Sequence, residues 1–312
     1  MKKAVVALGG NALRRKGEPF TIEHQYKNVK KVIKPVVQLI EKGFKIAITH
    51  GNGPQVGVEF FRNLYTRDKF PPYPLDALNA ETQGWIGYII ARAIREQLYE
   101  DRIDRDVVAI VTQVMVDKND PAFSNPTKPI GDFFSKEEAM ELMKKYGWKM
   151  VEDAGRGYRV VVPSPLPIGT VEGKIIKKLV DEGSIVIASG GGGIPVVREN
   201  HGKFRGVEAV IDKDRASSVL AREIGASLLM ILTEVDYVYL NFGKPNEEPL
   251  ERVTLEQIER FYSEGHFPPG SMGPKIEAAI DFLKNGGEEV IITSIEKAHD
   301  ALYNGMGTHI VV

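Results

Sequence analysis

Three lysines in this chain stand beside glycine, proline or aspartate residues, and lysine is a residue type that phosphoryl transfer uses. Lys213 lies in Asp212-Lys213-Asp214, and Lys275 follows Gly273-Pro274; each is expected to open a helix. Lys128 lies between two prolines in Asn125-Pro126-Thr127-Lys128-Pro129. Because a transferred phosphoryl group spreads its charge over several oxygens, fixed cations near it lower the barrier. A solvated surface position is the alternative for each lysine, so the interpretation depends on the loops around them.

Five glycine-rich loops are each expected just after a strand. They are Leu8-Gly9-Gly10-Asn11, His50-Gly51-Asn52-Gly53, Gly190 to Gly193, Gly206-Val207-Glu208 and Gly270-Ser271-Met272-Gly273. The carboxyl ends of parallel strands share one rim of a sheet, and glycine lets backbone amides approach a ligand closely. Such loops together predict an anion cradle for the phosphates of a nucleotide. A tight turn is the alternative for a single loop, although four consecutive glycines are harder to explain in that way.

The first two loops are expected to hold the group that is transferred. The amides of Gly9 and Gly10 suit a phosphate oxygen, and the side-chain amide of Asn11 can donate to the same group. Pro54 fits the first position of a helix, so the amides of the second loop and the helix dipole would point at one spot. His50 alone is more often a structural residue than a catalytic one.

The loops belong to an alternation of apolar runs and helical patterns that is typical of an α/β fold with a parallel sheet. Ala4 to Leu8 and Lys45 to Thr49 predict two strands, with a helix between them that Thr21 caps. Further strands are predicted at 107–112, 185–189, 228–232, 290–293 and 308–311, and helices at 78–99, 137–146, 173–181, 215–224, 255–262 and 275–284.

The alternation stops between residues 116 and 167, a stretch rich in Pro, Gly, Asp and Lys. It is too long for an ordinary loop between a strand and a helix. We interpret it as a small protruding subdomain inserted into a single domain that spans residues 1–312. Either it is a lid that closes over the site, or it is a surface embellishment.

Composition excludes several classes of protein. The formal net charge of −1 gives no reason to expect a nucleic acid or an acidic membrane as partner, and a chain with 0 cysteines has no disulfide or thiolate site. The apolar run after Met1-Lys2-Lys3 is too short for a signal peptide or a membrane span, which favours a cytoplasmic protein. The chain has no P-loop and no Gly-x-Gly-x-x-Gly after its first strand. No metal site is expected in the protein itself, so Mg²⁺ would arrive bound to the nucleotide.

Long, ordered motifs along the whole chain resemble the carbamate kinases, a family of the amino acid kinase superfamily. The resemblance is carried by Leu8 to Leu13, His50 to Gly57, Gln83 to Tyr88, Val116 to Phe123, Asn125 to Pro129, Val162 to Pro165, Ala188 to Pro195, Gly206 to Asp214 and Gly265 to Lys275. It implies a three-layer αβα sandwich with a mainly parallel sheet, assembled as a homodimer. It also implies reversible transfer of a phosphoryl group between ATP and carbamate, giving ADP and carbamoyl phosphate. The reverse direction, from carbamoyl phosphate to ADP, would be used to make ATP.

The resemblance also implies roles for individual residues. Lys213 and Lys275 would act on the phosphate chain, Asp214 would orient them, and Lys128 would descend from a mobile subdomain. The transferred group would be held by Asn11, Gly9, Gly10, Gly51, Asn52 and Gly53. The nucleotide would contact Gly190, Gly191, Gly192, Gly193, Met272 and Gly273. Leu232 to Lys244 is where adenine and ribose contacts are to be sought.

Three positions depart from the family pattern. Val160 stands where members commonly carry a second arginine, Glu234 where aspartate is usual, and Thr82 where serine is common. If that arginine touches the substrate, a kinase of another small carboxylate is the alternative. A nucleotide-binding regulator without catalysis is disfavoured because Lys128, Lys213, Asp214 and Lys275 are all present.

Overall fold

The computed structural model describes residues 1–14, 17–153 and 155–312, without the side chain of Asn11. Its largest sheet has eight strands in the order β15-β17-β16-β12-β1-β2-β9-β3. They are β1 (Lys3–Leu8), β2 (Lys45–His50), β3 (Val107–Ala109), β9 (Ile185–Ile187), β12 (Leu228–Thr233), β15 (Arg252–Thr254), β16 (Glu289–Ser294) and β17 (Thr308–Val311). Neighbouring strands are parallel except for β16 and β17, so the predicted mainly parallel sheet is confirmed.

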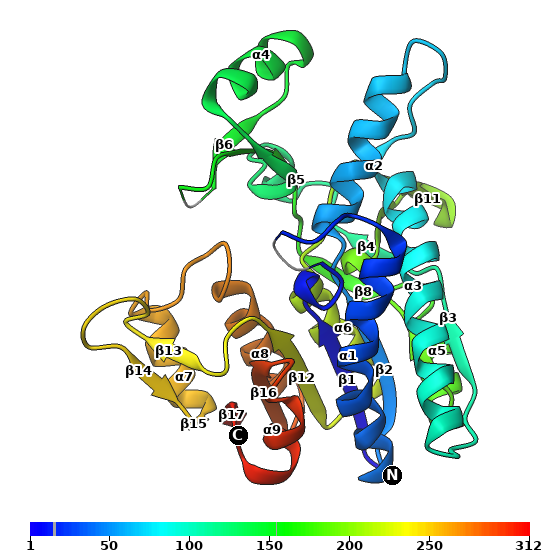
Figure 1. Ribbon diagram of the computed structural model, residues 1–312, viewed down its shortest axis with the longest axis vertical. Helices are drawn as coiled ribbons and strands as arrows, with labels where there is room; N and C mark the ends of the chain where they lie inside the picture. The colour runs from blue at the N-terminus through cyan, green and yellow to red at the C-terminus, as the bar shows by residue number, and fades with distance from the viewer. Residues whose placement is uncertain (15–16, 154) are drawn as a thin grey trace.

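Helices cover both faces of this sheet, as the three-layer prediction requires (Figure 1). One face carries α1 (Ile22–Glu41), α3 (Leu75–Glu100) and α9 (Ala298–Asn304), and the other carries α5 (Gly173–Asp181), α6 (Lys213–Ile224), α7 (Leu255–Ser263) and α8 (Gly273–Lys284). The alternation within β1 follows from the pleat, because Val6 packs on the first group and Val5 on the second. The Thr21 hydroxyl accepts from the His24 N–H and caps α1, as predicted.

The sequence analysis missed a second sheet, with the order β11-β10-β4-β8. Its strands are β4 (Gln113–Val116), β8 (Pro167–Thr170), β10 (Ile194–Arg198) and β11 (Phe204–Gly206). The strand predicted at 107–112 ends at Ala109, and beyond it the Gln83 side chain accepts from the N–H of Thr112 at 2.8 Å and donates to its carbonyl at 3.1 Å. Another small sheet pairs β13 (Val238–Leu240) with β14 (Glu248–Leu250).

The segment 116–167, for which we keep the name protruding subdomain, contains β5 (Lys128–Phe134), α4 (Lys136–Tyr146), β6 (Met150–Glu152) and β7 (Tyr158–Val162). Figure 1 shows α4 and β6 standing apart from the large sheet, on the same side as α2 (Gly53–Thr66). The chain leaves β4 at Val116 and returns in β8 at Pro167, and these two residues pair. Helix α2 shares the apolar core of this subdomain through Val56, Phe60 and Phe61.

Glycines make the contact between α2 and the subdomain possible. A Cβ on Gly57 would lie 2.0 Å from the Gly131 Cα, so the two backbones touch with no side chain between them. Gly131 also has φ +73°, a conformation that favours glycine. Strand β5, which begins with Lys128, is therefore seated directly on the helix that begins at Gly53.

Two of the five glycine-rich loops do not follow a strand of the large sheet. Gly206-Val207-Glu208 comes at the end of a strand, as predicted, but that strand is β11 of the second sheet, and the loop lines a separate hollow with Asp76 and Arg205. Gly270-Ser271-Met272-Gly273 follows helix α7, not a strand, and leads directly into α8. Among the described residues, no helix is long and apolar enough to cross a membrane.

Candidate active site

A cleft of about 370 Å³ lies at the carboxyl ends of β1, β2 and β12. Its floor contains the Gly9-Gly10 and His50-Gly51-Asn52-Gly53 loops together with the start of α6. The protruding subdomain adds Lys128, Arg156 and Arg159 from above. The predicted lysines and the first two glycine-rich loops thus meet in one place.

Lys213, Asp214 and Lys275 form a buried cluster of charges in this cleft. The Asp214 side chain accepts from the Lys213 ammonium through Oδ1 and from Lys275 Nζ through Oδ2, the second at 3.1 Å. Lys213 and Lys275 both lie in the first turn of their helices, α6 and α8, as predicted. A helix start carries a partial positive charge, so each ammonium adds to an existing positive field.

Burial and charge act against each other on the pKa values of this cluster. Burial lowers the pKa of Lys213, and the nearby charge of Lys275 lowers it further, although Asp214 opposes both. Burial also acts to lower the pKa of Lys275, but Asp214 and Asp212 raise it above the ordinary value. Burial alone would raise the pKa of Asp214, but the two lysines lower it. The Asp214 carboxylate therefore lies between the two lysine side chains and opposes the effect of burial on both of them.

Lys128 reaches the same cleft from β5. Its Nζ lies 2.5 Å from Asp212 Oδ2, while Asp212 Oδ1 accepts from the backbone N–H of Asp214 at 2.9 Å. Asp212 is the N-cap of α6 and is 7% exposed. Asp212, for which pairing with a lysine was the expected use, thus joins β5 to the start of α6.

The glycines of the first two loops differ in what they offer a ligand. The N–H groups of Gly9 and Gly51 are already donated to the carbonyls of Leu232 and Leu8, at 3.1 and 3.0 Å. In this structure these two amides are therefore donated within the sheet and its rim, and the contact of Gly9 and Gly51 with a phosphoryl group stays a prediction. The two glycines also provide space: a Cβ on Gly51 would come within 3.3 Å of the Lys213 side chain.

The amides of Gly10 and Gly53 are better placed for an anion. Each begins a helical turn, where the first N–H groups have no partner within the helix. The Asn52 N-cap of α2 and the Met272 N-cap of α8 make no side-chain capping bond. The side chain of Asn11, predicted to contact the transferred group, lies outside the described part of the structure.

Asn52 is held rigidly by helix α3. Its Nδ2 donates to Asn79 Oδ1 at 2.9 Å and to Thr82 Oγ1 at 2.8 Å, and the residue is 2% exposed. Thr82 supplies the hydroxyl that serine would provide, so this departure from the family pattern preserves the contact. Neither Asn79 nor Thr82 was predicted as part of the site, because their role depends on a contact between distant elements.

The run Gly190 to Gly193 packs behind the second loop. Gly191 lines the cleft, and all four glycines are buried. A Cβ on Gly190 would meet the His50 ring at 2.3 Å, and one on Gly191 would meet the Asn52 side chain at the same distance. Close packing thus accounts for glycine at these positions, which the sequence analysis had attributed to a ligand. Burial lowers the pKa of His50 to about 4, so the ring is neutral at neutral pH.

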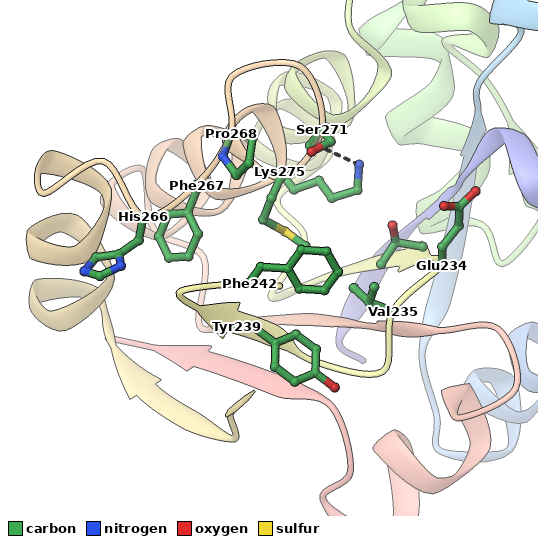
Figure 2. Close-up of a pocket in the computed structure, with 11 residues that line it drawn as sticks. Glu234, Val235, Tyr239, Phe242, His266, Phe267, Pro268, Ser271 and Lys275 are labelled. Carbon is green, nitrogen blue, oxygen red and sulfur yellow. Dashed lines mark hydrogen bonds between the residues drawn. The ribbon is translucent and has the colours of Figure 1, made fainter. Parts of the chain in front are cut away.

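A second, aromatic pocket of about 190 Å³ adjoins the cleft. Figure 2 shows Tyr239, Phe242 and Phe267 around it, with Lys275 and Glu234 at the side toward the cleft. Both hollows share the lining residues Thr233, Glu234, Ser271 and Lys275. Met272 lines the aromatic pocket, while a Cβ on Gly273 would lie 2.9 Å from the Pro268 carbonyl oxygen. A flat apolar group in this pocket could therefore continue into an anionic group near Lys275.

The model of the amino acid kinase family matches residues 2–294. This chain belongs to the amino acid kinase family. A carbamate kinase of Pyrococcus horikoshii is 49% identical over 99% of both chains, and a carbamate kinase-like protein, YahI, of Escherichia coli is 49% identical over 98% of both. The solved structure of carbamate kinase from Giardia lamblia bound to AMP-PNP is 43% identical, covers 99% of this chain and 98% of its own, and has a TM-score of 0.91.

Val160, the departure that raised the question of another substrate, does not line the cleft. It is 2% exposed in the core of the protruding subdomain, where it packs with Ile130 and Met150. Its neighbour Arg159 does line the cleft and is fixed by the Gly131 carbonyl and by Asp153. The Val160 side chain therefore faces the core of the subdomain, and Arg159 supplies the cation that this strand adds to the cleft.

Proposed function

We propose that this member of the amino acid kinase family transfers a phosphoryl group between ATP and carbamate, giving ADP and carbamoyl phosphate. The observation that carries the proposal is the pair of adjoining hollows that meet at Lys275, one aromatic and one lined by lysines and helix starts. An adenine ring fits the first, and a phosphate chain fits the second. The relative from Giardia lamblia binds AMP-PNP, which supports this use of the pockets.

In the proposed reaction a carbamate oxygen attacks the γ-phosphorus of ATP, and the bond to the bridging oxygen breaks as ADP leaves. Lys213 and Lys275 would stabilise charge on the transferred group and on the leaving phosphate, and Asp214 would hold both ammonium groups in place. The amides of Gly10 and Gly53 would contact the oxygens of the transferred group. Lys128 would complete the ring of donors from above. Such fixed donors act on charge that develops in the transition state.

The donor set also suits a small substrate without an ammonium group. A buried α-ammonium requires an anionic or carbonyl partner. Of the carboxylates that line the cleft, those of Asp212 and Asp214 are paired with lysines, and the charge of Glu234 acts on Lys275, whose pKa it helps to raise. We therefore propose carbamate or carbamoyl phosphate as substrate rather than an amino acid.

Mg²⁺ would neutralise charge on the nucleotide phosphates. No group of three or more His, Asp or Glu residues in the described part of the chain could hold a metal ion. We propose that phosphate oxygens and water hold the ion, with Asp212 and Asp214 kept for the lysines. We also propose a cytoplasmic homodimer, as the family resemblance implies, and light scattering of the purified protein tests that assembly.

The deciding experiment is a kinetic panel. Formation of ATP from ADP is measured with carbamoyl phosphate and with other acyl phosphates, and the reverse reaction is measured with carbamate, aspartate, glutamate and acetylglutamate. We expect carbamoyl phosphate and carbamate to have the highest kcat/KM. A higher kcat/KM for any other substrate at the same nucleotide concentration would overturn the assignment.

A further inference from the structure

Asp212 uses its two carboxylate oxygens for two different tasks. Oδ1 accepts from the Asp214 N–H and caps α6, while Oδ2 accepts from Lys128 Nζ at 2.5 Å. The cap needs only one uncharged oxygen, since serine and asparagine are about as good as aspartate at this position. Capping therefore does not explain why a buried charge stands here.

The charge is explained by what lies around it. Among the described residues, the charged side chains that line the cleft are five cations and three carboxylates: Lys128, Arg156, Arg159, Lys213, Lys275, Asp212, Asp214 and Glu234. Asp214 is occupied by Lys213 and Lys275. Without Asp212, Lys128 would approach two like charges with no counter-charge of its own, and like charges at short range in a partly desolvated site repel strongly.

We propose that Asp212 is a positioning residue for phosphoryl transfer, which holds the Lys128 ammonium, and with it the protruding subdomain, above the transferred group. This inference rests on the proposed function. An ammonium group has three donors, so Lys128 can keep Asp212 as one partner and direct another N–H at a phosphoryl oxygen. Asp212 acts through Lys128 and contacts neither the nucleotide nor the acceptor.

Asp212→Asn separates the two tasks, because asparagine keeps an oxygen for the cap and loses the charge toward Lys128. We expect kcat to fall roughly 10- to 100-fold, as when a positioned donor is lost, while KM for ADP and the unfolding temperature change little. Asp212→Ser is the second variant, since serine also caps helices well. It should show the same pattern, so the test survives if one of the two proteins folds poorly.

A double-mutant cycle decides whether Asp212 acts through Lys128. If it does, Lys128→Ala combined with Asp212→Asn should have nearly the same kcat as Lys128→Ala alone. Losses that multiply in the double variant would overturn the proposal, and so would a wild-type kcat for Asp212→Asn.

The Arg14–Asp132 ion pair supplies a matched control. It also joins β5 to the main body, at 2.7 Å, but neither residue lines the cleft. Asp132→Asn should leave kcat within about twofold of wild type, because exposed pairs contribute little. If Asp132→Asn lowers kcat as much as Asp212→Asn does, the loss comes from weakening any contact between the subdomain and the main body. That result would overturn the specific role of Asp212. All ratios are measured with the acyl phosphate that wild type uses best, so they hold or fail independently of whether that substrate is carbamoyl phosphate.

Discussion

Both sides of the cleft carry cationic side chains, but the two sets differ in burial and in how firmly they are held. On the side of the large sheet, the Lys213 and Lys275 side chains are 11% and 15% exposed and are fixed by Asp214. On the side of the protruding subdomain, the Lys128 side chain is 29% exposed and that of Arg156 is 57% exposed. The positions of the charges on the first side are fixed by the large sheet and its helices. The positions of those on the second side depend on how the subdomain packs against the rest of the molecule.

This difference separates two functions that a phosphotransferase needs. Groups that stabilise the transition state work best when they are preorganised and need no rearrangement. Groups that enclose the substrate and exclude water must be able to withdraw so that product can leave. We therefore expect variants on the sheet side to lower kcat directly. Variants at the contact between α2 and the subdomain should lower kcat by displacing Lys128.

The largest effect is expected at the sheet side. Lys213→Ala or Lys275→Ala should lower kcat by about 10²- to 10³-fold, by analogy with the loss of one preorganised oxyanion donor. Nucleotide affinity should weaken less, because each charge acts mainly on the transition state. Steady-state kinetics with ADP and carbamoyl phosphate, together with calorimetric nucleotide binding, measure both quantities. Near wild-type turnover would exclude that lysine from the chemistry.

A smaller effect is expected where the subdomain rests on α2. Gly57→Ala places a Cβ about 2 Å from the backbone of Gly131, so β5 must move away and carry Lys128 with it. A displacement of about 1 Å can cost up to 10²-fold in rate, and we expect a loss of about tenfold or more in kcat.

Gly84→Ala in helix α3 is the matched control for this variant. A Cβ there meets nothing within 4 Å, and alanine favours a helix over glycine by about 1 kcal/mol. Its kcat should equal that of wild type.

Hydrogen exchange tests whether the protruding subdomain closes over the cleft as a lid. Residues 116–167 should exchange more slowly when nucleotide and substrate bind together. Equal exchange in free and liganded wild-type protein would contradict the lid.

The sequence predicted the sheet side of the site better than the subdomain side. Lys213 and Lys275 could be found because local signals, an N-cap aspartate and a Gly-Pro pair, mark the helix starts. Asp212 was expected to pair with a lysine, but the sequence could not show that this lysine is Lys128, and Thr82 could not be linked to Asn52, because both contacts join distant segments. The same limit holds at Gly9 and Gly51, where glycine indicates close approach but not whether a ligand or another strand approaches. Val160 suggested another substrate only because the sequence does not show which face of a strand is buried.

The aromatic pocket should respond more weakly than the lysines. Phe242→Ala removes a ring at its mouth, and stacking on a base is worth about 1–3 kcal/mol. Since Phe242 is 60% exposed, we expect the lower end, a five- to tenfold increase in KM for ADP with kcat within about threefold. Phe70→Ala, a similarly exposed phenylalanine outside both hollows, should leave KM unchanged. A fall in kcat with unchanged KM at Phe242 would place the base elsewhere.

The smallest effect on catalysis is expected at His50, which acts on stability. Burial lowers its pKa from 6.5 to about 4 in the folded protein, whereas the unfolded chain keeps the ordinary value. Between these two pH values the unfolded state binds a proton that the folded state does not, so the free energy of unfolding falls as the pH falls. The loss from this residue amounts to about 3 kcal/mol across the whole interval and is absent above pH 6.5. His50→Gln should be less stable at neutral pH because it disturbs the packing on Gly190, yet its free energy of unfolding should decline less steeply toward acid. Urea unfolding of both proteins across this interval measures the two slopes, and identical slopes would show that His50 is not held neutral by burial.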